Sequence, residues 1–150
     1  MPRIDKVLFT GKTHTAATPR DGTSRSAHGR LDIKTSASGS GTSQEQTFAA
    51  ALAHPTAEQL FAGAWSACYI SAIGVAAQQK KIALPADLAV DLEIDLGQTG
   101  EDYFIAARFN VNVPGVDQAV AEGLVHEAHQ ICPYSKAVKG NIDVAVNVTV

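Results

Sequence analysis

An uncharged, alanine-rich run at residues 60–77 constrains the fold of this chain of 150 residues more than any other feature. Thr56 is a preferred type of helix N-cap residue, and Leu84-Pro85 stops the run on its other side, so one long helix is predicted from Thr56 to about Lys81. A membrane-spanning helix needs about 20 predominantly apolar residues, whereas this run contains glycine, serine and cysteine. We therefore expect a helix that is buried on all sides in a soluble protein, with no membrane as partner.

Alternating polar and apolar positions predict strands before and after this helix. The strands expected are residues 4–18, 24–35, 88–96, 103–113 and 142–150. The first two form an N-terminal β-hairpin arm at residues 1–35, because the Asp21-Gly22 pair is a strong turn signal. In the clearest of the strands, Val90, Leu92 and Ile94 share one face and are expected to line the core.

Apolar residues at helical spacing predict a second long helix over residues 116–131, which Pro133 ends. The alanine-rich residues 44–53 predict a further short helix. The strands pair as hairpins and do not alternate regularly with helices, which indicates an α+β protein. Residues 1–150 have the length of a single domain, with residues 1–35 as its arm.

The composition excludes several classes of protein. Hydrophobic residues make up 45% and charged residues 18%, which excludes intrinsic disorder. A net charge of −3 and an aromatic content of 6% argue against a nucleic-acid-binding domain. The first residues are charged and do not resemble a targeting signal, so we expect a cytoplasmic protein, in which thiols stay reduced unless chemistry oxidises them.

Two cysteines are the main candidates for chemistry. Cys68 lies in the middle of the apolar helix; taken alone, such a residue is more often a buried hydrophobe than a nucleophile, and an uncharged helix raises the pKa of a thiol. Its reactivity would need a cation from elsewhere in the chain. Cys132 lies where the second helix stops, with rigid backbone on one side and a turn on the other. Together the two residues form the smallest possible redox pair.

The histidines near Cys132 suggest two other chemistries. His126, His129 and Cys132 are spaced for one helix face, but a zinc site takes four ligands, or three and a water, and no second pair of ligands is evident. We therefore expect ordinary polar-face histidines and no metal. A Cys/His hydrolase, with Cys68 as nucleophile and His129 as base, lacks an orienting third group and an oxyanion loop. A non-catalytic binder of small apolar molecules is a further alternative.

Two segments resemble the signature segments of the Ohr/OsmC peroxidases. They are residues 58–69 (EQLFAGAWSACY) and residues 132–142 (CPYSKAVKGNI), and Pro19-Arg20-Asp21-Gly22 and Ala128-His129 also match. The resemblance covers essentially the whole chain, and its second segment is more similar to the Ohr branch (organic hydroperoxide resistance) than to the OsmC branch. The chain departs from the family at Thr56-Ala57, where Asn-Pro is usual, and at Trp65, where Tyr is common.

The resemblance implies an α+β fold of two long helices packed with antiparallel sheets in an intertwined homodimer. It also implies a peroxidase that reduces organic hydroperoxides to alcohols without a bound cofactor. Cys68 would be the peroxidatic thiol that becomes a sulfenic acid, and Cys132 the resolving thiol that condenses with it to a disulfide. An external dithiol, dihydrolipoamide on lipoylated proteins, would reduce that disulfide again.

The resemblance also assigns roles to residues around the thiols. Arg20 matches the family's arginine, which favours the thiolate, and Glu58 matches the glutamate that pairs with it. Phe61, Trp65 and Tyr69 would give the organic tail of the substrate a dry pocket, so hydrogen peroxide is expected to be the poorer substrate. An OsmC-branch peroxidase with a different substrate preference is the nearest alternative.

Overall fold

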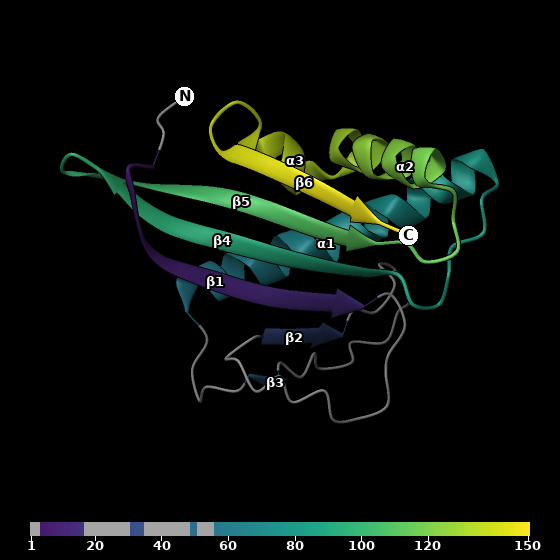
Figure 1. The fold of residues 1–150 in the computed structure, drawn as a ribbon, viewed down its shortest axis with the longest axis horizontal. Helices are drawn as coiled ribbons and strands as arrows, with labels where there is room; N and C mark the ends of the chain where they lie inside the picture. Colours follow the sequence, from purple (N-terminus) through teal and green to yellow (C-terminus); the bar gives the residue numbers. More distant parts are fainter. Residues whose placement is uncertain (1–3, 17–30, 35–48, 51–55) are drawn as a thin grey trace.

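The computed structural model describes residues 4–16, 31–34, 49–50 and 56–150 of the chain. Within these residues the strands form a single sheet in the order β3-β2-β1-β4-β5-β6, and the helices lie against one face of it (Figure 1). The strands are β1 (Lys6–Ala16), β2 (Leu31–Lys34), β3 (Ala49–Ala50), β4 (Ala89–Thr99), β5 (Asp102–Asn112) and β6 (Asp143–Thr149). The helices are α1 (Ala57–Lys80), α2 (Gln118–Ile131) and α3 (Pro133–Val138).

The predicted long helix is present as α1 and is capped as its sequence indicates. The Thr56 side chain accepts a hydrogen bond from the backbone N–H of Gln59, and the Gln59 side chain accepts one from the backbone N–H of Thr56, which is a capping box. At the other end Lys81 takes a left-handed conformation with φ of 57°, and its N–H bonds back to the helix carbonyls. The first and last turns therefore leave few backbone groups without a partner.

The first turn of α1 rests directly on β1 because residue 11 is glycine. A Cβ atom at Gly11 would lie 2.6 Å from Cβ of Glu58 and 2.8 Å from the backbone nitrogen of Gln59. Any side chain there would push the helix off the strand, since such approaches are far inside van der Waals contact. Gly11 thus sets the distance between the start of α1 and the sheet.

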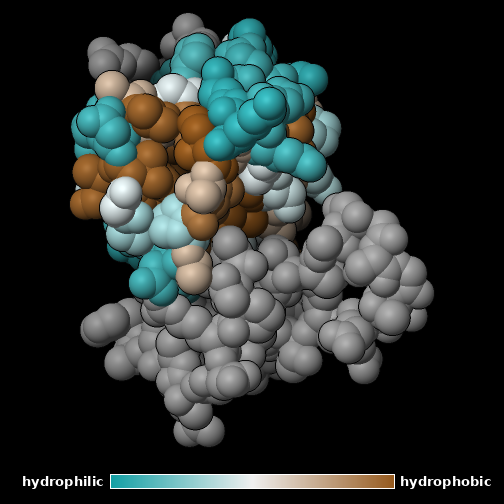
Figure 2. Space-filling view, turned by 90° about the vertical axis from the view of Figure 1, so that its right-hand side faces the viewer, coloured by the Kyte–Doolittle hydropathy of each residue, from teal (hydrophilic) through white to brown (hydrophobic). Residues whose placement is uncertain are grey.

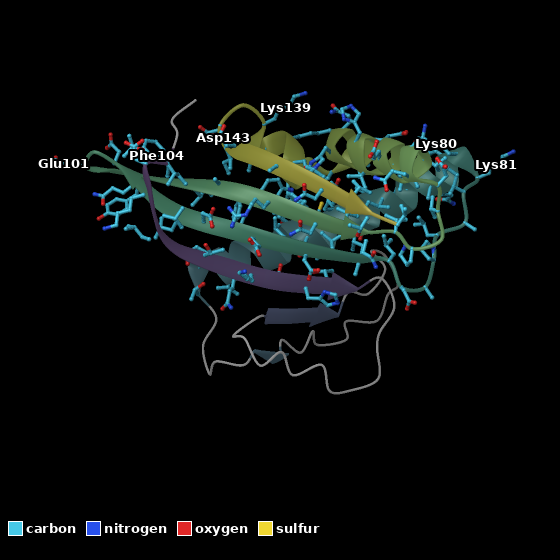
Figure 3. All side chains as sticks on the ribbon, viewed as in Figure 1. Lys80, Lys81, Glu101, Phe104, Lys139 and Asp143 are labelled. Carbon is cyan, nitrogen blue, oxygen red and sulfur yellow. The ribbon has the colours of Figure 1, made fainter. Side chains whose placement is uncertain are left out.

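The core lies between α1, α2 and the sheet. Trp65 and Tyr69 of α1 pack on Phe109 of β5, with ring centroids 4.9 Å and 4.7 Å from that of Phe109. The apolar positions of β4 that the alternation predicted are buried, namely Val90, Leu92 and Ile94. Lys80 at the end of α1 forms an ion pair of 2.8 Å with Glu127 of α2, which ties the two helices together. Lys80 lies at one end of the molecule, and Glu101, in the turn between β4 and β5, lies at the other (Figure 3).

Within the described part of the chain one face of α1 is exposed, so the expectation of burial on all sides is wrong for the single chain. Leu60 and Val75 are 50% and 40% exposed, and Ala64 and Ser71 lie exposed between them on the same helix face. Hydrophobic surface is also visible at the end of the molecule where α1 terminates (Figure 2). By length and composition α1 could cross a membrane, but 56% of its most apolar window is buried, as in the core helix of a globular protein.

The α+β class is confirmed, but the sheet is mixed where antiparallel sheets were expected. The hairpin predicted at residues 1–35 is wrong: β1 and β2 pair in parallel, with Thr13 opposite Leu31. Parallel neighbours need a connection of about a dozen residues or more, and residues 17–30 are long enough to supply one. The turn signal at Asp21-Gly22 lies outside the described residues. β5 and β6 also pair in parallel.

A further local prediction fails because context overrides its signal, and another, that Pro133 ends the second helix, is confirmed but incomplete. The predicted helix at residues 44–53 is wrong at Ala49–Ala50, which form β3 and pair with β2; the rest of that segment lies outside the described residues. Pro133 does more than end α2, because it occupies the first turn of α3. Proline is favoured at that position, since its missing N–H has no partner in a first helical turn.

The opposite face of the sheet carries an ionic network centred on Arg108. Its guanidinium bonds both Asp95 and Glu93, at 3.0 Å and 2.8 Å, and Lys12 also pairs with Glu93 at 2.8 Å. Burial works to raise the pKa of Asp95, but hydrogen bonds from Arg108 and Thr10 outweigh it and hold that pKa below its usual range. Asp95 is only 4% exposed, so its charge depends on these partners.

Replacing Arg108 by leucine should lower the free energy of unfolding by about 2 kcal/mol, because it leaves the buried Asp95 carboxylate without its cation. Lys12→Leu is the matched control: it removes a half-exposed ion pair on the same face and should cost less than about 1 kcal/mol. Urea unfolding followed by circular dichroism measures both. Equal losses in the two variants would show that Asp95 does not depend on Arg108.

Candidate active site

The structure brings the two cysteines into contact. Sγ of Cys68, in the middle of α1, lies 3.1 Å from Sγ of Cys132, which stands between α2 and α3. Both are free thiols. A disulfide needs the sulfur atoms about 2.0 Å apart, so a small movement at Cys132 would suffice to form one. The pair that the sequence marked as a possible redox couple is thus assembled.

The two thiols differ in their access to solvent. Cys132 is 0% exposed, whereas Cys68 is partly exposed. Cys132 is held by backbone on both sides: its N–H donates to the carbonyl of Ala128 at 2.8 Å, and its carbonyl accepts from Lys136 at 3.1 Å. Cys68 is therefore the thiol that a dissolved reactant meets first, and Cys132 lies behind it.

The described surroundings keep Cys68 protonated at neutral pH. Burial, and after it the hydrogen bond with Cys132, raise its pKa to about 11, although a hydrogen bond from the backbone of Tyr134 works in the opposite direction. Of the described residues, none supplies a positive charge that lowers this pKa. A reactive Cys68 therefore needs a cation from outside them, as the uncharged helix indicated.

Arg20, the cation assigned by resemblance, lies outside the described residues. Glu58 is in the first turn of α1, partly exposed and against Gly11 of β1. Ten residues of helix separate it from Cys68, or about 15 Å along the axis, so it reaches the thiol only through an intermediary. The roles of Arg20 and Glu58 stay predictions.

The three residues assigned to a substrate pocket differ in exposure. Trp65 and Tyr69 are fully buried, and the Tyr69 hydroxyl donates to the carbonyl of Val125 at 2.6 Å. Phe61 is partly exposed and meets Trp65 edge to face, with ring centroids 5.8 Å apart. The structure places Phe61 where a ligand could touch it, with the other two behind it. Their assignment to a pocket stays a prediction.

One residue of the site was not expected from sequence. Ser135 of α3 is 7% exposed, and its Oγ lies 3.0 Å from Nε1 of Trp65 and 3.1 Å from Nδ1 of His129. Both bonds cross between helices, so no local pattern announces them. The one available signal is spacing: His129 and Ser135 stand three residues before and three residues after Cys132.

His129 is not the polar-face histidine that the sequence predicted. Its ring packs against Tyr69 and Phe109, with centroids 4.4 Å and 5.2 Å away, and burial followed by repulsion from His126 lowers its pKa to about 4. Its Nδ1 bonds Ser135, and its buried Nε2 has no hydrogen-bond partner among the described residues. Neither nitrogen bonds Cys68, which argues against a Cys/His hydrolase. Within the described part of the chain no cluster of His, Cys, Asp and Glu is suited to a metal.

An α+β fold whose helices bring a half-exposed and a buried thiol together has the architecture of a dithiol redox protein. The model of the OsmC-like protein family matches residues 51–147. An organic hydroperoxide resistance protein from Xanthomonas axonopodis pv. citri is 37% identical over 153 aligned positions, which cover 97% of this chain and 98% of the relative. The chain therefore belongs to the OsmC-like family, and the names of its relatives support a peroxidase role of the Ohr/OsmC type.

Solved structures agree with this assignment. A crystal structure of an organic hydroperoxide resistance protein from Legionella pneumophila superposes with a TM-score of 0.62 at 37% identity, covering 67% of this chain and 74% of that one. A second, from Vibrio cholerae with captopril bound in one of the active sites, gives 0.59 at 36% identity and covers 64% and 66%. Both likenesses support the same fold.

The half-buried, neutral His129 predicts a pH dependence of stability. Its pKa is near 4 in the folded chain and about 6.5 when unfolded, so unfolding takes up a proton between these values. The stability that neutral His129 allows is present above pH 6.5 and is lost as pH falls toward 4. Because water partly screens the site, we expect a loss of about 1–2 kcal/mol.

His129→Phe should remove this component from the curve of unfolding free energy against pH, measured by urea titration between pH 4 and 8. His126→Gln, which changes an exposed histidine one turn away, is the control and should keep most of it. A curve for His129→Phe with the wild-type slope would contradict the assignment.

Proposed function

We propose that this chain is a cysteine-based peroxidase that reduces organic hydroperoxides to alcohols. The observation that carries the proposal is the pair of free thiols 3.1 Å apart, with Cys68 accessible and Cys132 buried behind it. A peroxidatic thiol must be accessible to the substrate, and a resolving thiol must lie close enough to attack it afterwards. The names of the relatives supply the substrate class.

The proposed reaction begins at Cys68. Its thiolate attacks the outer oxygen of the hydroperoxide, the O–O bond breaks, and the departing alkoxide takes a proton to leave as alcohol. Cys68 is then a sulfenic acid. The Cys132 sulfur attacks the Cys68 sulfur, the S–O bond breaks, the oxygen leaves as water, and a disulfide forms. An external dithiol reduces the disulfide by exchange and is itself oxidised to a disulfide; dihydrolipoamide on lipoylated proteins is the proposed source.

Arg20 is proposed as the cation that makes Cys68 a thiolate, with Glu58 as its ion-pair partner. The support is that Cys68 needs a nearby positive charge to ionise at neutral pH. Its pKa is raised to about 11, with burial as the largest cause, and the described residues offer no charge to lower it. Arginine suits this role because its planar guanidinium can bond a carboxylate and still face a thiolate. Glu58, fixed in the first turn of α1, would orient it.

An apolar substrate tail is proposed to lie against Phe61, with Trp65 and Tyr69 forming the wall behind it. The partly exposed Phe61 beside the buried ring of Trp65 supports this. The captopril bound in an active site of the Vibrio cholerae relative shows that in that protein the site admits a small organic molecule. Hydrogen peroxide, which gains nothing from apolar contact, would be the poorer substrate.

A cytoplasmic homodimer is proposed as the working form, with no part for nucleic acid, membrane or metal. The uncovered face of α1, which carries the exposed Leu60 and Val75, is the kind of surface that a second copy of the chain would bury. The acidic balance of the chain fits the absence of nucleic acid as a partner.

One observation favours a second candidate. The raised pKa of Cys68 is also what an inert, buried thiol would show, and this fits a non-catalytic binder of small apolar molecules. Incubation with cumene hydroperoxide followed by a thiol count separates the two. The peroxidase loses both thiols and regains them with dihydrolipoamide, whereas the binder loses neither. An OsmC-branch enzyme would differ only in its order of preference among hydroperoxides.

Cys68→Ser should reduce peroxide consumption below about 1% of wild type, because a serine hydroxyl is not a usable nucleophile at neutral pH. Cys132→Ser should consume one equivalent of peroxide and then stop as sulfenic acid. Peroxide assays with cumene hydroperoxide and dihydrolipoamide measure both variants. Sustained turnover by Cys132→Ser would remove Cys132 from the mechanism, and activity in Cys68→Ser would remove Cys68.

Arg20→Ala should raise the pKa of Cys68 by one to three units, which is the typical range for loss of an opposite charge at contact distance. Arg20→Lys should restore only part of the loss, and Glu58→Ala should give a smaller shift by misplacing Arg20. The rate of Cys68 alkylation by iodoacetamide against pH, measured in a Cys132→Ser background, reports this pKa. Lys12→Ala, which removes a cation from the opposite face of the sheet, is the control. Superimposable profiles for wild type and Arg20→Ala would exclude Arg20 as the source of reactivity.

A further inference from the structure

Three side chains joined by hydrogen bonds stand at matching sequence distances from the two cysteines. Trp65 stands three residues before Cys68, and His129 and Ser135 stand three residues before and after Cys132. The Ser135 hydroxyl meets both of the others, at 3.0 Å from Trp65 and 3.1 Å from His129. It therefore links α1, α2 and α3 through residues that lie within one helical turn of the cysteines in sequence.

The direction of the hydrogen bonds follows from the chemistry of the groups. The indole of Trp65 only donates, so Ser135 accepts from it and has its own hydroxyl proton left to give. The available acceptor is Nδ1 of His129, which must then be unprotonated, with the ring proton on Nε2. A neutral His129 is also what burial and the lowered pKa require. The side-chain hydroxyl of Ser135 thereby both accepts and donates a hydrogen bond.

The placement of Ser135 bears on Cys132 more than on Cys68. Cys132 occupies the joint between α2 and α3, in an extended backbone conformation that belongs to neither helix. The helix hydrogen bonds at this joint do not touch α1. The bond from Trp65 to Ser135 does, and it fastens the first turn of α3 to the same helix that carries Cys68.

We propose that Ser135 is a positioning residue for the resolving step, holding the Cys132 sulfur against Cys68 through its bonds to Trp65 and His129. The inference deepens the proposed function and rests on it. In the step concerned, the Cys132 sulfur attacks the sulfenic sulfur of Cys68, and the Cys68 S–O bond breaks as water leaves. We call the two hydrogen bonds of Ser135, to Trp65 and to His129, the Ser135 clamp. Without this clamp the segment at Cys132 between α2 and α3 shifts, and misplacement of reacting atoms by about 1 Å can slow a step by up to about 100-fold.

The attack of Cys68 on the peroxide does not involve Cys132 and should depend little on Ser135. A single-turnover experiment with cumene hydroperoxide separates the two steps, because peroxide loss reports the first and the lifetime of the sulfenic acid, trapped with dimedone, reports the second. Ser135→Ala should change the first rate by less than about threefold and slow the second about 10- to 100-fold. Ser135→Thr keeps a hydroxyl and should recover most of the second rate.

The matched control is Ser71→Ala, which removes an exposed hydroxyl from α1 one turn beyond Cys68, where it bonds the carbonyl of Ala67. Trp65→Phe removes the same clamp from the other side while keeping an aromatic ring in the core, and serves if Ser135→Ala does not fold. It should slow the second step as Ser135→Ala does. Equal second-step rates in wild type and in these variants would overturn the inference, as would equal slowing by Ser71→Ala.

A measurement without peroxide keeps this test separate from that of the proposed function. Reaction with 5,5′-dithiobis(2-nitrobenzoate) places a mixed disulfide on Cys68, and attack by Cys132 then closes the protein disulfide and releases a second thionitrobenzoate. The second phase should be slowed 10-fold or more by Ser135→Ala and restored by Ser135→Thr. If the wild-type protein forms its disulfide quickly but consumes no hydroperoxide, the proposed function is wrong and the positioning role of Ser135 is still supported. If the second phase is equally fast in wild type and in Ser135→Ala, the positioning role of Ser135 is wrong whatever the substrate of the protein.

Discussion

The packing of α1 between the sheet and α2 decides where the reactive side chains of this protein lie. Gly11 allows the first turn of α1 to touch β1, and Trp65 and Tyr69 then lock the next turns onto Phe109. Once α1 is fixed in this way, Cys68 faces the joint between α2 and α3, where Cys132 stands. A helix built of small and apolar residues can approach its neighbours this closely, and one with long polar side chains could not.

The same burial sets two demands that oppose each other. A buried Cys132 is protected and well placed, but a low-dielectric environment penalises the charged form of Cys68 and raises its pKa. A thiolate in such a site must be stabilised by a nearby charge or by hydrogen bonds, and the described residues supply one hydrogen bond, from the backbone of Tyr134. A cation brought in from another segment, as proposed for Arg20, would reconcile membership of the family with this unreactive local environment.

Sequence predicted the parts of the fold that are locally encoded. Local patterns predicted the cap of α1, the alternation of β4 and the helical spacing of α2, and most of the apolar positions in these patterns pack in the core. The parallel pairing of β1 with β2 and the strand at Ala49–Ala50 depend on partners distant in sequence. The turn signal therefore wrongly predicted a hairpin, and the alanine-rich composition wrongly predicted a helix. At the site, Cys68 and Cys132 were evident as residues, but their contact followed only from resemblance. Ser135 was not predicted, because its bond to Trp65 joins positions 70 residues apart.

The sheet separates two electrostatic environments, and this limits where the missing cation can come from. Arg108 lies on the face away from the helices and is already bound to Glu93 and Asp95, and Lys12 on the same face is paired as well. Their charge is neutralised locally, and a layer of buried aliphatic and aromatic side chains lies between them and Cys68. A cation that activates the thiol must therefore approach from the helix side of the sheet. Glu58, at the start of α1 on that side, is a fixed anion that could receive and orient it.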